Sequence, residues 1–177
     1  MTPTRHDKYK TRVEMADLCN ELDIRIAAEV GTDTGVFAVE FLNRWSGDLL
    51  LCIDPYDPYE EMDYDRLGDL LVAVQALSHY HGRVKFIKHR SPEIVDRLPE
   101  CHRPGFVYID GSHVYESAKA DVVGWWRYLR SGDVLAGHDY DEGHPGVQRA
   151  VDELAIEYDL SVSLTSECLP SWFVQKP

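Results

Sequence analysis

The stretch from Arg25 to Gly35 constrains the fold of this chain more than any other, because an apolar run leads directly into a glycine-containing turn. Residues 24–30 are mostly apolar, as expected of a central parallel strand that is covered on both faces. Gly31 and Gly35 then allow the backbone to turn sharply and to approach a ligand closely. An apolar pattern at helical spacing begins at Val36, so the N-terminus of that helix would face the same crevice. The sequence therefore predicts a strand, a turn and a helix that form a cofactor site.

The acidic residue and the glycine spacing of this turn limit the kind of cofactor that it could bind. The pattern Glu29-x-Gly31-x-x-x-Gly35 differs from the G-x-G-x-x-G pattern of dinucleotide-binding turns, and a carboxylate at Glu29 would repel a phosphate. The pattern resembles motif I of the class I S-adenosylmethionine-dependent methyltransferases, whose cofactor is cationic and has no phosphate. Thr32 lies within the same turn and is a further candidate contact. Taken alone, the motif is equally compatible with a glycine-containing turn in another α/β protein.

The length of 177 residues suits one domain with a substantial core. We expect a single domain over residues 1–177, with a leading helix in 1–22, a cofactor- and metal-binding core in 23–158 and a terminal hairpin in 159–177. The 31 acidic and 18 basic residues give a net charge of -13, so the overall field would repel a nucleic-acid backbone. The sequence shows neither the apolar segment of a signal peptide nor a run long enough to span a membrane. These features predict a cytoplasmic protein with neither nucleic acid nor membrane as a partner.

A second apolar run, residues 49–53, ends in the carboxylate of Asp54. In open parallel sheets the ligand lies outside the carboxyl ends of the strands, where an acidic side chain can accept hydrogen bonds from both ribose hydroxyls. The separation between Glu29 and Asp54 is close to the roughly 20 residues expected for that role. The alternative is that Asp54 only begins the turn that continues with Pro55.

The loop that follows is rich in tyrosine and carboxylate. Residues 55–66 include Tyr56, Tyr59 and Tyr64 and few aliphatic side chains, so they do not resemble core. Such a loop could line an acceptor pocket or act as a lid. A solvated acidic loop explains the same composition equally well.

Residues 84–89 alternate as in a third strand, and Ser91 and Pro92 follow where a short helix is predicted to begin. Serine is a favourable N-cap, and proline is favourable at the first helical position, so we expect Ser91 to cap this helix. The methyltransferase family contacts the adenine at this place in the chain. The resemblance therefore makes Ser91 a secondary cofactor candidate.

Potential metal ligands follow two further predicted strands. Asp110 ends the buried run 105–109, and His138 and Asp139 end the run 133–137. Because neighbouring parallel strands end at the same edge of a sheet, these side chains would lie within reach of one ion. Two carboxylates suit Mg²⁺ or Mn²⁺, and an imidazole shifts the preference towards Mn²⁺ or another transition ion.

Alternatives to these metal ligands remain open. His138 could instead be a core histidine or a residue that supports the ligands. In the loop that follows, Asp141 and His144 are weaker metal candidates, since a solvated acidic loop explains them adequately.

Several elements together resemble one methyltransferase branch over about residues 24–154. In order and spacing they are similar to the small-molecule O-methyltransferases of the macrocin and macrolide-sugar type, a metal-dependent branch of class I. Besides the first motif, the elements are Ile53-Asp54-Pro55, Asp110-Gly-Ser-His113-x-Tyr115, Gly137-His138-Asp139-Tyr140 and Pro145-Gly-Val-x-x-Ala150-Val-Asp-Glu153. The resemblance implies an α/β, Rossmann-like, doubly wound and mostly parallel seven-stranded sheet. Helices would cover both faces, and a C-terminal antiparallel hairpin would complete the sheet.

The resemblance also implies roles for individual residues. It implies S-adenosylmethionine as the cofactor and usually Mg²⁺ as the metal, and it makes His113 a general base. The position of His138 is commonly a carboxylate in this family, which puts the identity and the presence of the metal in question. The other roles are the methionine end for Glu29, Gly31 and Gly35, the ribose for Asp54, the metal for Asp110 and Asp139, and a further cofactor contact for Asp110.

The expected activity is therefore metal-assisted O-methylation of a small-molecule hydroxyl. One alternative is a metal-independent methyltransferase that acts on an amine or a carboxyl group. Another is an S-adenosylmethionine-binding domain without catalysis. Since the chain is short for such an enzyme, we expect a small acceptor or a homo-oligomer in which a second subunit contributes to the acceptor pocket.

Overall fold

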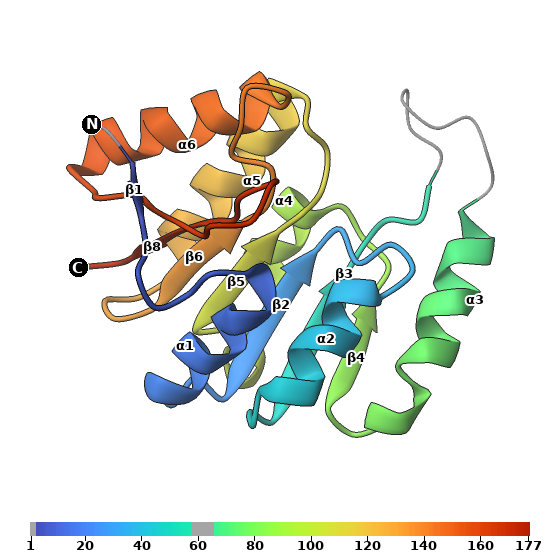
Figure 1. Ribbon diagram of the computed structural model, residues 1–177. Helices are drawn as coiled ribbons and strands as arrows, with labels where there is room; N and C mark the ends of the chain where they lie inside the picture. Colours follow the sequence, from blue (N-terminus) through green and yellow to red (C-terminus); the bar gives the residue numbers. More distant parts are fainter. Residues whose placement is uncertain (1–2, 58–65) are drawn as a thin grey trace.

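The strands of this protein form a single mostly parallel sheet. The structure is a computed structural model that describes residues 3–57 and 66–177 (Figure 1). Within these residues the sheet has eight strands in the order β1-β7-β8-β6-β5-β2-β3-β4. The strands are β1 (Thr4–Arg5), β2 (Ile26–Val30), β3 (Leu49–Ile53), β4 (Val84–Ile87), β5 (Phe106–Ile109), β6 (Val134–Gly137), β7 (Ser163–Leu164) and β8 (Trp172–Gln175).

Helices cover both faces of the sheet (Figure 1). On one face lie α1 (Met15–Glu21), α2 (Val36–Arg44) and α3 (Leu67–Ala76), and on the other lie α4 (Ser91–Ile94), α5 (Tyr115–Tyr128) and α6 (Pro145–Tyr158). Successive strand residues point to opposite faces, so Ala27 packs in the cluster beneath α1 and α2, whereas Ala28 and Val30 pack beneath α5 and α6. The expected doubly wound fold is confirmed.

The register of the central strands aligns their carboxyl ends. Val30 of β2 is paired with Ile53 of β3 and with Ile109 of β5, and Ile109 is paired with Gly137 of β6. The chain runs from β2 to β3 and β4 on one side and returns to β5 on the other, so β2 marks the point where the strand order reverses. Ligands of open α/β sheets bind at this point, beyond the carboxyl ends.

The N-terminal segment differs from the expectation. A leading helix was expected within residues 1–22, and α1 lies there, but a short 3-10 turn, Arg12–Glu14, precedes it. Thr11 and Glu14 form a capping box in which the Glu14 carboxylate accepts the backbone N–H of Thr11 at 3.0 Å, so the helical segment begins only at Arg12. The residues before it form β1, which pairs with β7 and adds a short edge strand to the predicted sheet.

The C-terminal hairpin is present, but its second strand lies inside the sheet. β8 pairs antiparallel with both β6 and β7, and β7 has only two residues. Within the described residues, no helix is both long enough and apolar enough to cross a bilayer.

The backbone of Gly31 lies against the residue that follows β5, which leaves no room for a side chain. Its φ is +88°, and a Cβ there would overlap the carbonyl group of Asp110, 2.6 Å from the carbon. We expect Gly31→Ala to lower the free energy of unfolding by about 2–4 kcal/mol through overlap and backbone strain.

Gly82 provides the matched control, since its φ is +89° and no atom lies within 4 Å of a Cβ placed there. Gly82→Ala should cost only the backbone part, about 1–2 kcal/mol. Urea unfolding measures both variants, and equal losses would show that the contact with Asp110 is not what requires a glycine at position 31.

Candidate functional site

The predicted cofactor turn connects β2 with α2 at the carboxyl edge of the sheet. Glu29 is buried on the face covered by α1 and α2, and its Oε2 has no hydrogen-bond partner among the described residues. Burial raises the pKa of Glu29 well above its usual range, and the neighbouring Thr32 hydroxyl partly opposes this shift. An unused carboxylate oxygen in a buried place is a potential acceptor for a ligand with N–H or O–H groups.

Packing within the protein requires a glycine at position 31, and both glycines of the turn have positive φ values. Gly31 donates its N–H to the carbonyl of Ile53 at 2.8 Å and lies against Asp110. Gly35 has a φ of +81°, and a Cβ there would lie 3.3 Å from Leu77 Cδ1. The expected close backbone approach therefore exists, although its described neighbours are protein groups.

Asp54 lies after β3, as predicted, and its carboxylate is held by protein donors. Its Oδ2 accepts the backbone N–H of Asp33 at 3.0 Å, and its Oδ1 accepts that of Tyr56 at 2.8 Å. Arg66 Nη1 lies 3.0 Å from Oδ1, and both side chains are buried. Asp54 therefore stabilises the turn that follows β3, as the alternative interpretation expected, and also forms a buried ion pair with Arg66.

Arg66 was not identified from the sequence. Its guanidinium also binds Asp33 Oδ1 at 2.9 Å, so it joins the end of β3 to the cofactor turn. An arginine at the end of a tyrosine-rich loop gives no pattern from which this contact could be predicted.

The structure describes only part of the tyrosine-rich loop. Tyr56 is buried, and its hydroxyl donates to the carbonyl of Asp33 at 2.9 Å, which fixes its ring against the cofactor turn. Tyr59 and Tyr64 lie outside the described residues.

Ser91 occupies a different position from the one expected. Arg90 is the N-cap of α4 and Ser91 is its first residue. The Ser91 hydroxyl accepts a hydrogen bond from the buried Trp125 indole at 2.7 Å, which links α4 to α5. The adenine contact expected for Ser91 stays a prediction.

Asp110, His138 and Asp139 come together as predicted from the order of the strands. His138 Nδ1 lies 3.0 Å from Asp139 Oδ1 and 3.8 Å from Asp110 Oδ1, and one ligand atom from each residue lies within 4.8 Å of the others. The three side chains border a small cavity of about 10 Å³, roughly the space of one water molecule. Such a group of donors could hold a cation.

The charges of this group are tuned by contact and burial. Burial raises the pKa of Asp110, although His138 opposes the shift. Asp139 has the reverse balance, because hydrogen bonds from His113 and His138 outweigh burial and hold its pKa well below the usual range. Arg12, which was not singled out from the sequence, places Nη1 4.0 Å from Asp110 Oδ2.

His113 lies beside the same group and is half exposed. Its Nε2 lies 3.0 Å from Asp139 Oδ2, so the predicted base is joined to a predicted metal ligand. A carboxylate in this position fixes the orientation of an imidazole and stabilises its protonated form. His144 lies on the other side of the Asp139 carboxylate, with Nδ1 3.8 Å from Oδ1.

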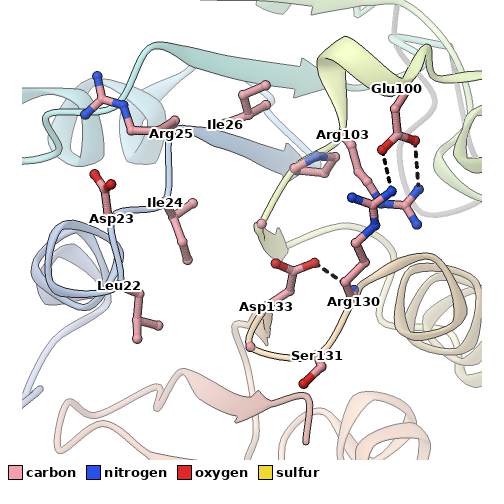
Figure 2. A pocket seen from close by; sticks show the side chains of 13 residues that line it. Leu22, Asp23, Ile24, Arg25, Ile26, Glu100, Arg103, Arg130, Ser131 and Asp133 are labelled. Atoms are coloured by element: carbon pink, nitrogen blue, oxygen red, sulfur yellow. Dashed lines mark hydrogen bonds and ion pairs between the residues drawn. The ribbon is translucent and has the colours of Figure 1, made fainter.

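A second cavity, of about 480 Å³, lies at the opposite edge of the sheet (Figure 2). It is lined by residues at the beginning of the strands, among them Ile24, Gly105 and Asp133. Its Arg103 and Arg130 both contact the carboxylate of Glu100, so their charges are compensated locally. None of the predicted site residues lines this cavity.

A family model described as a methyltransferase domain matches residues 28–140, more than half of the chain. No match was found among curated proteins.

Several solved structures share the fold. Cofactor-bound Rv0187 from MTB has a TM-score of 0.71 at 15% identity, and the match covers 92% of this chain and 78% of that chain. The O-methyltransferase TomG from Streptomyces achromogenes, involved in tomaymycin synthesis and in complex with SAM, has a TM-score of 0.67 at 15% identity, with 93% and 79% covered. An O-methyltransferase from Bacillus cereus in complex with SAH has a TM-score of 0.69 at 15% identity, with 97% and 84% covered. The chain therefore belongs to the methyltransferase domain family and has the fold of the class I S-adenosylmethionine-dependent methyltransferases.

Proposed function

We propose that this protein transfers a methyl group from S-adenosylmethionine to a hydroxyl group of a small molecule, assisted by a divalent cation. The observation that carries the proposal is the convergence of Asp110, His138 and Asp139 beside the cofactor turn, at the edge where the strand order reverses. The likeness in fold to O-methyltransferases that hold SAM or SAH supports this choice of reaction.

Residues of the cofactor turn fit a cationic amino acid group. Glu29 would accept hydrogen bonds from the methionine ammonium through its unused oxygen, with Gly31, Thr32 and Gly35 forming the turn around it. Asp54 would bind the ribose hydroxyls, which requires Arg66 to share or leave its carboxylate. When bound, S-adenosylmethionine supplies an electrophilic methyl group on its sulfonium.

Asp110, His138 and Asp139 fit a divalent cation such as Mg²⁺ or Mn²⁺, because they offer two carboxylates and one imidazole next to a cavity of ion size. The cation would supply Lewis acidity that makes a nearby substrate hydroxyl easier to deprotonate. Asp139 carries its negative charge at neutral pH, since its pKa is held low by the two histidines.

His113 would accept the proton of the substrate hydroxyl while the hydroxyl oxygen attacks the methyl group. The Asp139 carboxylate orients the imidazole by the 3.0 Å contact and stabilises the imidazolium that forms. The main contribution of the site is then to hold acceptor and donor together in a reactive orientation.

Metal-independent methyl transfer to an amine or a carboxyl group is the second candidate. It is favoured by the contacts that already join His113 and His138 to Asp139, because these satisfy the carboxylate without a cation. In that case Asp110 and His113 would shape the acceptor pocket.

The partner that we propose is a small-molecule acceptor, with neither nucleic acid nor membrane involved. A homo-oligomer is proposed as well. Among the described residues, α3 carries large apolar side chains that are exposed, and association of two copies would shield them: Leu67, Leu71, Val72 and Val74.

The cofactor role of Glu29 is tested by Glu29→Gln. We expect the affinity for S-adenosylhomocysteine to fall about 10- to 100-fold, since a hydrogen bond to a charged group contributes about 1.5–3 kcal/mol. Titration calorimetry measures the loss, and Glu157→Gln, at an exposed position on α6, is the control. Unchanged affinity in Glu29→Gln would remove the residue from the cofactor site.

The same substitution should stabilise the protein without ligand. Because burial raises the folded-state pKa of Glu29, its ionisation favours unfolding, and stability is lost as the pH rises from about 4.3 towards the raised value. Glu29→Gln lacks this loss. Its melting temperature should therefore match that of the wild type near pH 4 and exceed it at pH 7. A lower melting temperature for the variant at pH 7 would contradict the proposed cost of the buried carboxylate.

The metal role of Asp110 is tested by Asp110→Asn. Electron paramagnetic resonance of Mn²⁺ should show at least about 10-fold weaker binding than in the wild type, because one of two carboxylate ligands is neutralised. The affinity of the variant for S-adenosylhomocysteine should stay within about threefold of the wild-type value.

Methyl transfer by the wild type to a panel of catechols and vicinal diols should be abolished by EDTA. Activity that survives EDTA would instead support the metal-independent candidate.

A further inference from the structure

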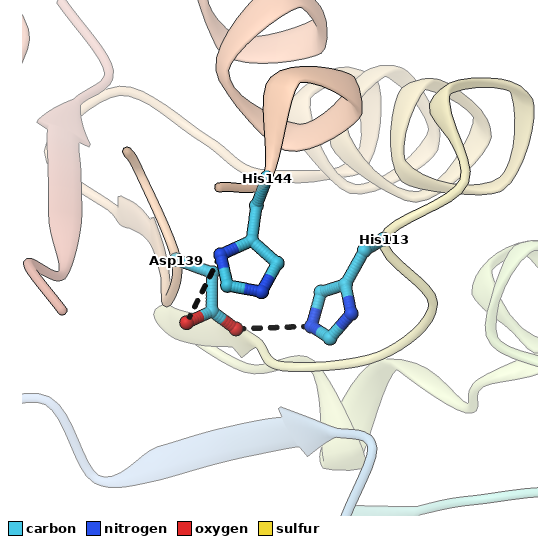
Figure 3. Close-up of side chains that lie close together, drawn as sticks. All are labelled: His113, Asp139 and His144. Atoms are coloured by element: carbon cyan, nitrogen blue, oxygen red, sulfur yellow. Dashed lines mark hydrogen bonds and ion pairs between the residues drawn. The ribbon is translucent and has the colours of Figure 1, made fainter. Parts of the chain in front are cut away.

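A second group of potential metal ligands lies next to the proposed cation site and shares one residue with it. His113 follows β5, Asp139 follows β6, and His144 is the N-cap of α6. Figure 3 shows both imidazoles beside the Asp139 carboxylate. His113 and Asp139 lie within residues 28–140, which match the methyltransferase domain, whereas His144 lies beyond them.

The spacing of the three side chains suits one transition-metal ion. His113 Nε2 is 3.0 Å from Asp139 Oδ2, and the ring centroids of the two histidines are 4.5 Å apart. One ligand atom from each of the three residues lies within 4.8 Å of the others. Ligands of a tetrahedral Zn²⁺ with bonds of about 2.0–2.1 Å lie about 3.3 Å from each other. Small rotations of the side chains would therefore suffice to surround an ion.

Asp141 holds His144 in a suitable orientation. Its Oδ1 lies 3.1 Å from His144 Nδ1 and also accepts the backbone N–H groups of Gly143 and His144, at 2.6 and 3.1 Å. Histidines that bind metals commonly donate their other ring N–H to a carboxylate, which fixes the tautomer and the ring orientation. With its proton on Nδ1, His144 would offer Nε2 to an ion, and that edge of the ring faces His113 (Figure 3).

The chemistry of the donors distinguishes this group from the first one. Two imidazoles and one carboxylate suit Zn²⁺ and similar transition ions, whereas Mg²⁺ prefers oxygen ligands. The group around Asp110 offers two carboxylates and a single imidazole. The two sites should therefore differ in their metal preference.

We propose that His113, Asp139 and His144 form a binding site for Zn²⁺ or a similar transition-metal ion, which neighbours the group around Asp110 and shares Asp139 with it. Three protein ligands leave a coordination position for water or an anion. One consequence rests on the proposed function: an ion at this site would occupy the imidazole of His113, and so Zn²⁺ would inhibit methyl transfer.

Titration of the EDTA-treated, dialysed protein with Co²⁺ tests the site without cofactor or acceptor. Co²⁺ bound by nitrogen and oxygen ligands in a low coordination number absorbs visible light, and Zn²⁺ should displace it. We expect the absorption of the wild type to saturate with one equivalent of Co²⁺ at this site. The result is independent of methyl transfer, so a failure of the proposed function would leave this test intact.

Substitutions locate the ion. His144→Ser should weaken Co²⁺ binding by about 100-fold or more, beyond the 10- to 100-fold typical of supporting residues. Serine is a favourable N-cap, so α6 should remain folded, which circular dichroism checks. Asp141→Asn should cause a smaller loss of Co²⁺ binding. His81→Ala is the control and should cause none, because His81 is exposed in the turn before β4 and belongs to neither group of ligands.

Asp110→Asn separates the two sites, because it removes a ligand of the first group only. It should retain the Co²⁺ absorption within about threefold of the wild-type affinity. The proposal would be overturned if folded His144→Ser bound Co²⁺ as tightly as the wild type, or if Asp110→Asn lost binding as severely as His144→Ser.

Discussion

The register of β2 with its two neighbours is the constraint on which the rest of the structure depends. Because Val30 is paired with both Ile53 and Ile109, the three strands end at one level, and the groups after them meet at one edge. Gly31 continues this alignment beyond the strands, because its N–H donates to the carbonyl of Ile53 and its Cα lies against Asp110. A slip of β2 by one residue would turn Glu29 to the opposite face of the sheet and separate it from the turn that it serves.

Acidic groups at this edge have opposite environments. Glu29 and Asp110 have pKa values raised by burial, so their charge opposes folding in the absence of a ligand. Asp139 is stabilised as a carboxylate by His113 and His138. The apolar clusters on both faces of the sheet can compensate the free-energy cost of these buried charges. A cationic ligand beside Glu29 and Asp110 would lower that cost. We therefore regard the buried acids as sites prepared for positive charge, with the sulfonium cofactor and the divalent ion as the proposed occupants.

Much of this architecture follows from patterns that a sequence displays. Buried strands are recognisable as apolar runs, and the residue after each run lies at the ligand-binding edge, which is why Asp54, Asp110 and His138 could be located correctly. Contacts between separate loops have no such pattern. Arg66 reaches Asp54 from the end of a loop, and Ser91 is held by Trp125 from another helix. His144 lies beside Asp139 because Asp141 holds it within the loop after β6. The composition of that loop does not reveal these contacts and resembles that of a solvated acidic loop.

A crystal structure of the protein soaked with S-adenosylhomocysteine and Mn²⁺, with anomalous data collected at the manganese edge, would show whether the acidic groups at this edge bind the nucleoside and the ion. We expect the nucleoside between Glu29 and Asp54, and an anomalous peak about 2.0–2.3 Å from carboxylate oxygens of Asp110 and Asp139. A nucleoside bound elsewhere would contradict this expectation. An ordered nucleoside with no anomalous peak beside Asp110 would retain the cofactor site and reject the metal.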